Sequence, residues 1–346
     1  MARPASPQVA TRGRRAIAAA ALERSGLGAL LRLAPAWRGL VVLNYHRIGT
    51  PDDSPLDRAM WNATLEDFDA QVGFLARNFD VIGPADVTAR PRGRQVLITF
   101  DDGYRDNHAA ALPVLQAHGA TATFFLTTGF LDAPRLAWWD EVAWMVRTSP
   151  RDSVCVDGAG VAFDAPDRAA AVAALLDRAK ALPGAELEGF LDRVALATGT
   201  GRAPALVSDG QWMTWRMARE LLAAGMDVGG HTVGHPILAR LDADAQRAEI
   251  RGCAARLRAE LGIPMRWFSY PNGDRSSFDA HTRALLEEAG VELAFSFDGG
   301  FLPRGAPWDP YDVPRIAVGP RTAGDAFAAT VTLPQVFIRS MAGSRR

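Results

Sequence analysis

The sequence predicts an α/β protein, a β/α barrel with a helical insertion over its rim. Eight short apolar runs recur along the chain and have the length and composition of buried strands. These runs are Val41–Tyr45, Phe79–Ile82, Val96–Phe100, Thr121–Leu126, Met226–Val228, Arg266–Tyr270, Glu292–Phe297 and Val313–Val318. Alternation of strands with helical patterns favours a parallel sheet with helical crossovers. About eight such strands fit a closed barrel better than an open sheet.

Three helical patterns lie between the predicted strands. Leu65–Asn78 places its apolar side chains on one face, as a helix packed on a core does. Asn107–Ala117 is followed by Gly119, a residue suited to end a helix. Asp242–Leu261 carries apolar residues at helical spacing. Each pattern therefore predicts a helix that covers the sheet.

The chain divides into four predicted parts. Residues 1–38 form a basic, amphipathic N-terminal segment, residues 39–325 form the barrel domain, and residues 326–346 form a C-terminal tail. Residues 132–209 depart from the strand–helix alternation, and no linker composition flanks them. They are therefore predicted to be a helical insertion over the rim rather than a separate domain.

The N-terminal segment resembles a signal peptide only superficially. Several arginines precede the alanine-rich run Ala16–Leu22, but Glu23 and Arg24 interrupt that run before an apolar core accumulates. No stretch approaches the roughly 20 apolar residues of a spanning helix. The segment is expected to contact a membrane surface peripherally or to pack as a helix on the domain. The expected location is cytoplasmic or peripheral to a membrane.

Composition and charge narrow the function classes. The chain has 346 residues, 48% of them hydrophobic, and a formal net charge of −1. Nothing resembles a basic stripe, so no nucleic-acid partner is expected. Cys155 and Cys253 lack CxxC spacing and indicate neither a zinc site of their own nor a disulfide framework.

Polar residues follow four of the predicted strands. His46 follows the first run, Asp101 and Asp102 follow Val96–Phe100, and His231 follows Met226–Val228. Pro271, Asn272 and Gly273 follow Arg266–Tyr270. Parallel strands of a barrel end at the same rim, where such folds carry their active sites. The sequence therefore predicts one site built from four strands.

A metal ion is the expected occupant of this site. The adjacent carboxylates of Asp101 and Asp102 repel each other, and a cation relieves that repulsion. His231 and His235 supply two further ligands, so one aspartate and two histidines leave positions open for water. An Asp-Asp pair alone fits a turn or helix cap, and His-x-x-x-His alone fits a surface coincidence. Their joint occurrence at strand ends favours the metal site.

Three motifs together resemble the polysaccharide deacetylase family, carbohydrate esterase family four. They are Thr99-Phe100-Asp101-Asp102-Gly103-Tyr104, His231-Thr232-x-x-His235 and Phe268-Ser269-Tyr270-Pro271-Asn272-Gly273. The resemblance runs in order from about Val41 to Val318. It implies a distorted (β/α)7–8 barrel that uses a divalent metal to remove acetyl groups from N-acetylated sugars.

The resemblance also implies residue roles. Asp101 would be the general base, and Asp102, His231 and His235 would hold the metal. Zinc is the first expectation, with cobalt, nickel or manganese as substitutes. Thr232 would brace the loop between the histidines. The oxyanion would be held by the metal and a backbone N–H. Candidate substrate or oxyanion residues are Tyr104, Tyr270, Pro271 and Asn272.

His46 is the expected proton donor to the departing amine. It lies in Asn44-Tyr45-His46-Arg47-Ile48, which is similar to the opening motif of the subgroup acting on poly-N-acetylglucosamine. Many family members carry an arginine where this chain has Ser269, and that arginine pairs with the catalytic aspartate. Arg315 either takes over this role or makes a simple salt bridge at the rim.

Other interpretations stay open. The expected partner is an N-acetylated glycan, but the same barrel and metal would suit a small non-sugar amide, or a degenerate glycan-binding protein. Non-haem iron chemistry does not explain Asp101 or His46. Four tryptophans fit core or cap packing, with stacking on a sugar face as the alternative: Trp138, Trp139, Trp212 and Trp215.

Overall fold

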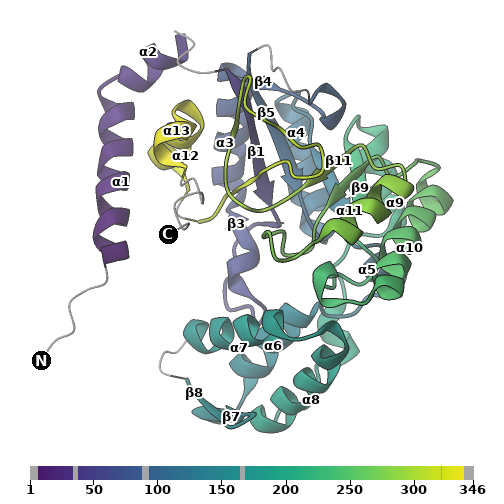
Figure 1. The fold of residues 1–346 in the computed structure, drawn as a ribbon. Helices are drawn as coiled ribbons and strands as arrows, with labels where there is room; N and C mark the ends of the chain where they lie inside the picture. Colours follow the sequence, from purple (N-terminus) through teal and green to yellow (C-terminus); the bar gives the residue numbers. More distant parts are fainter. Residues whose placement is uncertain (1–6, 34–37, 88–92, 164–167, 321, 339–346) are drawn as a thin grey trace, which may run out of the picture.

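A computed structural model describes residues 7–33, 38–87, 93–163, 168–320 and 322–338. Its centre is a curled sheet of parallel strands surrounded by helices (Figure 1). All eight predicted strand positions carry a strand. They are β1 (Gly39–Tyr45), β4 (Asp80–Val81), β5 (Arg94–Phe100), β6 (Thr123–Leu126), β9 (Asp227–Gly230), β10 (Trp267–Ser269), β11 (Leu293–Phe295) and β13 (Ile316–Ala317).

The sheet curls until its edges meet. The strand order is β11-β10-β9-β6-β5-β1, and every neighbouring pair in this series is parallel. Val313 bridges Phe295 at the end of β11, and β13 begins to pair with β1 three residues later. The segment from Val313 to Ala317 therefore joins the two edges, which confirms the predicted distorted barrel. The short strand β12 (Leu302–Pro303) adds to β1 in the antiparallel direction.

Strand register brings the carboxyl ends of the strands to one rim. β1 and β5 pair along their full length, from Gly39 with Arg94 to Tyr45 with Phe100. Every residue of β1 is buried, since helices cover one face of a parallel sheet and the barrel interior fills the other. The residues that follow Tyr45 and Phe100 consequently leave the sheet side by side.

The covering helices follow the sequence pattern closely. α3 (Leu65–Asn78) starts at its cap Thr64, and α10 (Ala243–Leu261) starts at Asp242 and ends at Gly262, whose φ is 70°. The expected helix at 107–117 is interrupted: a π-helical turn at Asn107–Ala111 precedes α4 (Leu112–Ala117). Pro113 lies at the start of α4, where its missing N–H is tolerated.

Further elements complete the barrel domain. They are β2 (Arg47–Ile48), β3 (Trp61–Ala63), α5 (Thr128–Asp132), α9 (Trp215–Ala223) and α11 (Ala280–Glu288). β2 and β3 form a separate small sheet beside the first strand of the barrel.

The inserted segment forms a lobe at the rim (Figure 1). It contains α6 (Trp138–Thr148), α7 (Ala169–Ala181) and α8 (Leu187–Thr198), whose buried side chains form a core of their own. It also contains a hairpin, β7 (Ser153–Val156) and β8 (Ala159–Ala162), which the helical prediction omitted. Asp157 and Gly158, both with positive φ, make its two-residue turn.

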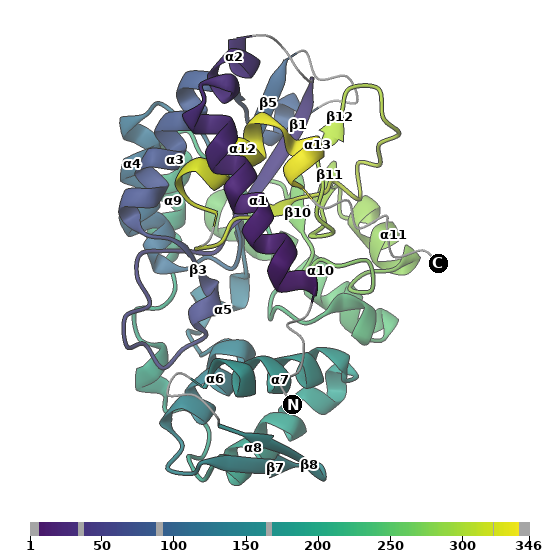
Figure 2. The ribbon, with the colours of Figure 1, turned by 90° about the vertical axis from the view of Figure 1, so that its left-hand side faces the viewer.

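The two ends of the chain pack together. α1 (Pro7–Arg24) crosses α12 (Gly324–Thr332), near α13 (Pro334–Phe337), as Figure 2 shows. Ala19 and Leu22 of α1 are buried in one cluster with Ala329. The predicted tail therefore contains two helices, because its apolar side chains find a partner in the N-terminal segment.

The N-terminal segment also leaves apolar side chains in solvent. In α2 (Leu27–Leu33), Leu30 is 62% exposed and Leu33 is 84% exposed. Among the described residues, no helix has both the length and the apolar character needed to cross a bilayer. Peripheral membrane contact stays a prediction.

Candidate metal centre and active site

The two adjacent aspartates at the end of β5 face different partners. The Asp101 N–H donates to the Tyr45 carbonyl at 3.0 Å and continues the pairing with β1. Asp102 then adopts φ 74°, a left-handed conformation that few non-glycine residues adopt. This turn separates the two carboxylates: Asp101 contacts Arg315, and Asp102 contacts two histidines.

Asp102, His231 and His235 converge on one point. Oδ1 of Asp102 lies 3.3 Å from Nε2 of His231 and 3.3 Å from Nε2 of His235. One candidate ligand atom from each residue lies within 4.8 Å of the others, and all three residues are buried. Asp102 Oδ1 has no hydrogen-bond donor among the described residues. A buried anionic oxygen without a donor is costly, and a cation between the three ligands satisfies it.

The hydrogen bond on the far side of His231 fixes its ring. Nδ1 lies 2.7 Å from the Ser269 carbonyl, which only accepts, so Nδ1 carries the proton in the neutral ring. The lone pair of Nε2 then faces Asp102, as in histidines whose other nitrogen is held by a carbonyl beside a metal. The residues present therefore fit a divalent metal.

Electrostatics at the three residues agree with a cation site. Burial opposes ionisation of Asp102, but the neighbouring imidazoles of His231 and His235 outweigh it and lower the pKa of Asp102. Burial also disfavours the charged form of His231, yet the neighbouring carboxylates raise its pKa. For His235, burial prevails and lowers the pKa. The carboxylate is thus ionised and ready to bind a cation.

The loop between the histidines is held from two sides. Thr232 and His235 have φ of 66° and 59°, so the loop adopts a conformation that its sequence alone disfavours. On one side, the N–H groups of Thr128 and Gly129 donate to the carbonyls of Thr232 and Val233. Within the loop, the Thr232 hydroxyl accepts the His235 N–H at 2.9 Å.

Glu249 holds the other side of this loop, a role that the sequence pattern around it does not indicate. Its Oε2 accepts the N–H groups of Val233 and Gly234, both at 2.8 Å. Glu249 lies on α10, where a glutamate on a helix resembles an ordinary solvent-facing residue. Only the tertiary packing of α10 against the loop reveals the contact.

Asp101 is held by side chains from β1, from β10 and from the residue before β13. Arg315 donates two parallel hydrogen bonds to its oxygens, both at 2.8 Å. Ser269 and Asn44 each donate to Oδ2 at 3.2 Å. Burial disfavours the charged form of Asp101, but the Arg315 guanidinium and the nearby histidines outweigh it and lower the pKa of Asp101.

Ser269 and Arg315 are complementary. The Ser269 hydroxyl accepts a hydrogen bond from Arg315 at 2.8 Å, and the small serine leaves space for the guanidinium. Arg315 reaches Asp101 from the segment that joins the sheet edges. It is 1% exposed, so the contact is a buried ion pair and not one at the surface of the rim.

His46 leaves β1 next to this cluster. Its backbone N–H donates to Asn62, and its ring lies edge-on to Phe297 with centroids 6.4 Å apart. His46 contributes to lowering the pKa values of both Asp101 and Asp102. Its buried Nδ1 has no hydrogen-bond partner among the described residues. The structure thus brings His46 to the same rim.

Two tyrosines predicted as substrate or oxyanion residues pack elsewhere. Tyr104 is fully buried, accepts a hydrogen bond from Trp139 and stacks on Trp212 with centroids 4.7 Å apart. Tyr270 stacks on Phe278 and donates to the Tyr311 carbonyl. Each ring is thus buried in packing, and a substrate or oxyanion role for either residue stays a prediction.

The Pro271–Asn272 turn is rigid. The Asn272 side chain donates to Ser277 and Asp274 within its own loop, and its φ is 63°. At Gly273 an added Cβ would lie 2.7 Å from that of Phe297, so only glycine fits there. This turn stays available as a backbone donor next to Ser269, while the Asn272 amide is already engaged.

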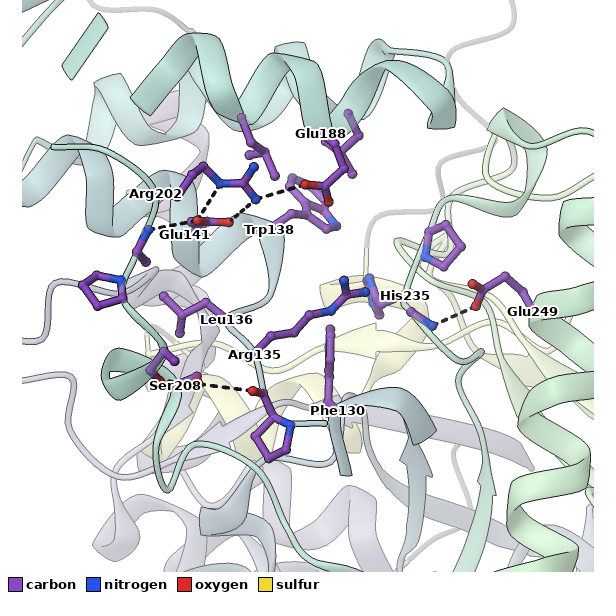
Figure 3. Close-up of a pocket in the computed structure, with 18 residues that line it drawn as sticks. Phe130, Arg135, Leu136, Trp138, Glu141, Glu188, Arg202, Ser208, His235 and Glu249 are labelled. Atoms are coloured by element: carbon purple, nitrogen blue, oxygen red, sulfur yellow. Dashed lines mark hydrogen bonds and ion pairs between the residues drawn. The ribbon is translucent and has the colours of Figure 1, made fainter. Parts of the chain in front are cut away.

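A cleft of about 500 Å³ opens beside His235, between the barrel rim and the lobe. Figure 3 shows its walls, with Phe130, Arg135, Trp138 and Glu249 around it. Three of the four candidate tryptophans, Trp139, Trp212 and Trp215, are buried in packing. Trp138 alone among them lines the cleft.

Comparison with known proteins agrees with this geometry. The sequence model of the family described as Polysaccharide deacetylase matches residues 88–150 and 196–294. A curated relative from Bacillus subtilis (strain 168), "Putative polysaccharide deacetylase YxkH", is 32% identical over 94 residues. That match covers 25% of this chain and 31% of the relative, so it spans about a third of the relative's length.

Solved structures share the fold along most of the chain. The Streptococcus pyogenes deacetylase PplD, solved with acetate, has a TM-score of 0.56 at 16% identity and covers 86% of this chain and 99% of its own. IcaB from Ammonifex degensii has a TM-score of 0.52 at 21% identity and covers 85% and 97%. Residues 88–150 and 196–294 of this chain thus match the polysaccharide deacetylase family, and the solved structures share the fold around them.

Proposed function

We propose that this protein is a metal-dependent hydrolase that removes acetyl groups from N-acetylated amino sugars of a glycan. The observation that carries the proposal is the buried Asp102, His231 and His235 cluster with Asp101 beside it but bound to Arg315 instead. This arrangement supplies both a cation site and a separate carboxylate. The match to the family supports the same reaction.

Asp102, His231 and His235 would hold the metal. One carboxylate and two imidazoles suit Zn²⁺, and Co²⁺, Ni²⁺ or Mn²⁺ tolerate the same donors. When bound, such an ion polarises the acetamide carbonyl and lowers the pKa of a coordinated water.

Asp101 and His46 would move the protons. Because Arg315 keeps Asp101 ionised, its carboxylate can accept the proton of the attacking water. The backbone of the Pro271–Asn272 turn is a candidate donor to the oxyanion. His46 would then donate a proton to the departing amine. The products are acetate and the free amino sugar, and the water proton remains on Asp101 until the site is reset.

The position of His46 suggests the type of glycan. It follows the first strand in Asn44-Tyr45-His46-Arg47-Ile48, the motif that resembles the poly-N-acetylglucosamine subgroup. We therefore propose a polymer of N-acetylglucosamine or a related precursor as the substrate.

Replacing Asp101 with asparagine tests this function. Asp101→Asn should lower acetate release from N-acetylglucosamine oligomers at least about 10²-fold, since a general base contributes roughly that much or more. Metal content should remain close to that of the unmodified protein. The exposed Asp53→Asn is the matched control. Undiminished turnover by Asp101→Asn would remove Asp101 from the mechanism.

A further inference from the structure

The cleft beside His235 is built jointly by the barrel and the lobe. Gly234, His235 and Glu249 form its barrel side, and Trp138 and Leu187 contribute from α6 and α8 of the lobe. Its volume of about 500 Å³ is far larger than an acetyl group requires and lies within the range of small-ligand sites. The cleft therefore has room for a further part of the substrate.

Most charged groups of the cleft wall are already paired. Arg202 donates two hydrogen bonds to Glu141, at 2.8 and 2.9 Å, and further bonds to Glu188 and Asp192. The Ala203 N–H also donates to Glu141 at 3.0 Å. These contacts hold α6, α8 and the segment after α8 together. Arg202 is thus a structural residue of the wall.

Arg135 differs from Arg202 in having no acidic partner. Within the described ranges, no carboxylate oxygen lies within 4.0 Å of its guanidinium, which is 5.9 Å from the centre of the Phe130 ring. In Figure 3 its side chain extends across the cleft toward His235. The guanidinium therefore offers several N–H donors next to a candidate metal ligand.

Glu249 offers an acceptor at the same place. Its Oε2 is used by the two N–H groups of the metal-ligand loop. Its Oε1 and Nη2 of Arg135 both lie over Gly234: a Cβ built on that glycine would be 3.3 Å from the former and 3.4 Å from the latter. The Arg135 guanidinium, a donor, and Oε1 of Glu249, an acceptor, thus lie next to each other beside Gly234, which has no side chain.

We propose that this cleft binds a neighbouring sugar of an oligomeric substrate, and this proposal rests on the deacetylase function proposed above. Arg135 donates to hydroxyl or carbonyl oxygens of that sugar, and Oε1 of Glu249 accepts from a hydroxyl. Phe130 and Trp138 provide apolar ring surface for the faces of a pyranose. Arg135 is thereby a specificity-determining residue that favours a chain over a single N-acetylated sugar.

Chain-length dependence of acetate release tests the proposal. N-acetylglucosamine oligomers of one to six residues, both β-1,4- and β-1,6-linked, are given to the metal-loaded protein. We expect kcat/KM to rise at least about tenfold between the shortest substrates and the pentamer. Arg135→Ala should reduce that ratio by about tenfold, the effect of losing a hydrogen bond to a charged group. Arg135→Lys should restore part of it.

Two controls separate this proposal from the deacetylase function. Arg151→Ala changes a lobe arginine outside the cleft and should leave the ratio unchanged. Calorimetric binding of the same oligomers to metal-loaded Asp101→Asn measures the cleft without turnover. Acetate release that is independent of chain length, or an unchanged ratio in Arg135→Ala, overturns the subsite. Failure of every oligomer to release acetate contradicts the function, and the binding titration then decides the subsite by itself.

Discussion

At the residue scale, Asp101 and Asp102 show how neighbouring identical side chains acquire different roles. The left-handed backbone at Asp102 points its carboxylate at two imidazoles, whereas Asp101 stays in line with β5 and contacts Arg315. A buried ion pair of this kind is a weak source of net stability. Breaking it is nevertheless destabilising, since the remaining charge is left buried and unpaired.

Removing Arg315 should therefore affect folding and catalysis. Arg315→Ala is expected to lower the free energy of unfolding by about 3–5 kcal/mol. Arg315→Lys should lose less because it keeps a positive charge, although it cannot donate in parallel to both oxygens. Urea unfolding measures the stability of each variant. Arg266→Ala, which breaks an exposed pair with Glu292, should change little. A similarly small change in Arg315→Ala would show that the buried pair does not form.

Asp140 is a second residue whose charge state depends on burial. It is fully buried in α6, accepts the Asp57 N–H at 2.9 Å and lies 3.4 Å from the Tyr104 hydroxyl. Burial raises the pKa of Asp140 to about 7, against the partial compensation of the Arg47 charge. The folded protein thus binds this proton more tightly than the unfolded chain does.

The pH dependence of stability follows from that direction. Because the pKa of Asp140 is raised in the folded state, its contribution to stability is full below the unfolded pKa of about 3.8 and declines as pH rises to about 7. The free energy of unfolding of Asp140→Asn minus that of the unmodified protein should therefore be larger at pH 8 than at pH 5. Urea unfolding at the two values checks this, with the exposed Asp177→Asn as control. Equal differences at both pH values would contradict the raised pKa.

At the element scale, α10 contacts the candidate metal site through Glu249. The helix packs against β9, and Glu249 accepts two N–H groups of the loop that carries His235. Without this acceptor, the positive-φ conformations of Thr232 and His235 lose a restraint. A helix outside the barrel thereby orients a residue on its rim.

Loss of the Glu249 carboxylate should weaken metal binding. Glu249→Ala is expected to raise the metal dissociation constant about 10–100-fold, the usual effect of removing a partner that orients a ligand. Glu249→Gln keeps an oxygen acceptor and should have a smaller effect. Competition with a chromophoric chelator measures the constant, and the visible spectrum of the cobalt form reports ligand geometry. Glu260→Ala on the same helix is the control. Unaltered affinity and spectrum in Glu249→Ala would rule out the positioning role.

Particular elements show what the sequence could predict. Eight buried strands were found because a strand covered on both faces is a continuous apolar run. The hairpin of β7 and β8 was missed, since its short strands lie outside the alternation of the barrel. Glu249 and the inward-facing Asn44 were missed as site residues because their partners are distant in sequence. The sequence does not show that the rings of Tyr104 and Tyr270 are buried, since tertiary packing, not proximity to a motif, decides where a ring lies.

At the scale of the whole molecule, the barrel and the lobe contribute different parts of the candidate site. The barrel gathers Asp101, Asp102, His231, His235 and His46 from separate strand ends onto one rim. The lobe closes one side of that rim and completes the cleft beside His235. Residues 151–195 of the lobe lie outside the match to the family. Asp101, Asp102, His231 and His235 lie inside that match, whereas His46 and Arg315 lie outside it. We therefore expect the four matched residues to carry chemistry shared with the family, and the lobe to be one of the parts in which this chain differs.

Asp102, His231 and His235 are proposed to hold one ion while Asp101 stays free of it. Anomalous X-ray diffraction at the zinc edge, from crystals of the zinc-loaded protein, would locate that ion. We expect a single strong peak bound by Asp102, His231 and His235, with the Asp101 carboxylate still paired with Arg315. A peak coordinated by Asp101, or the absence of any ion between the two histidines, would contradict it.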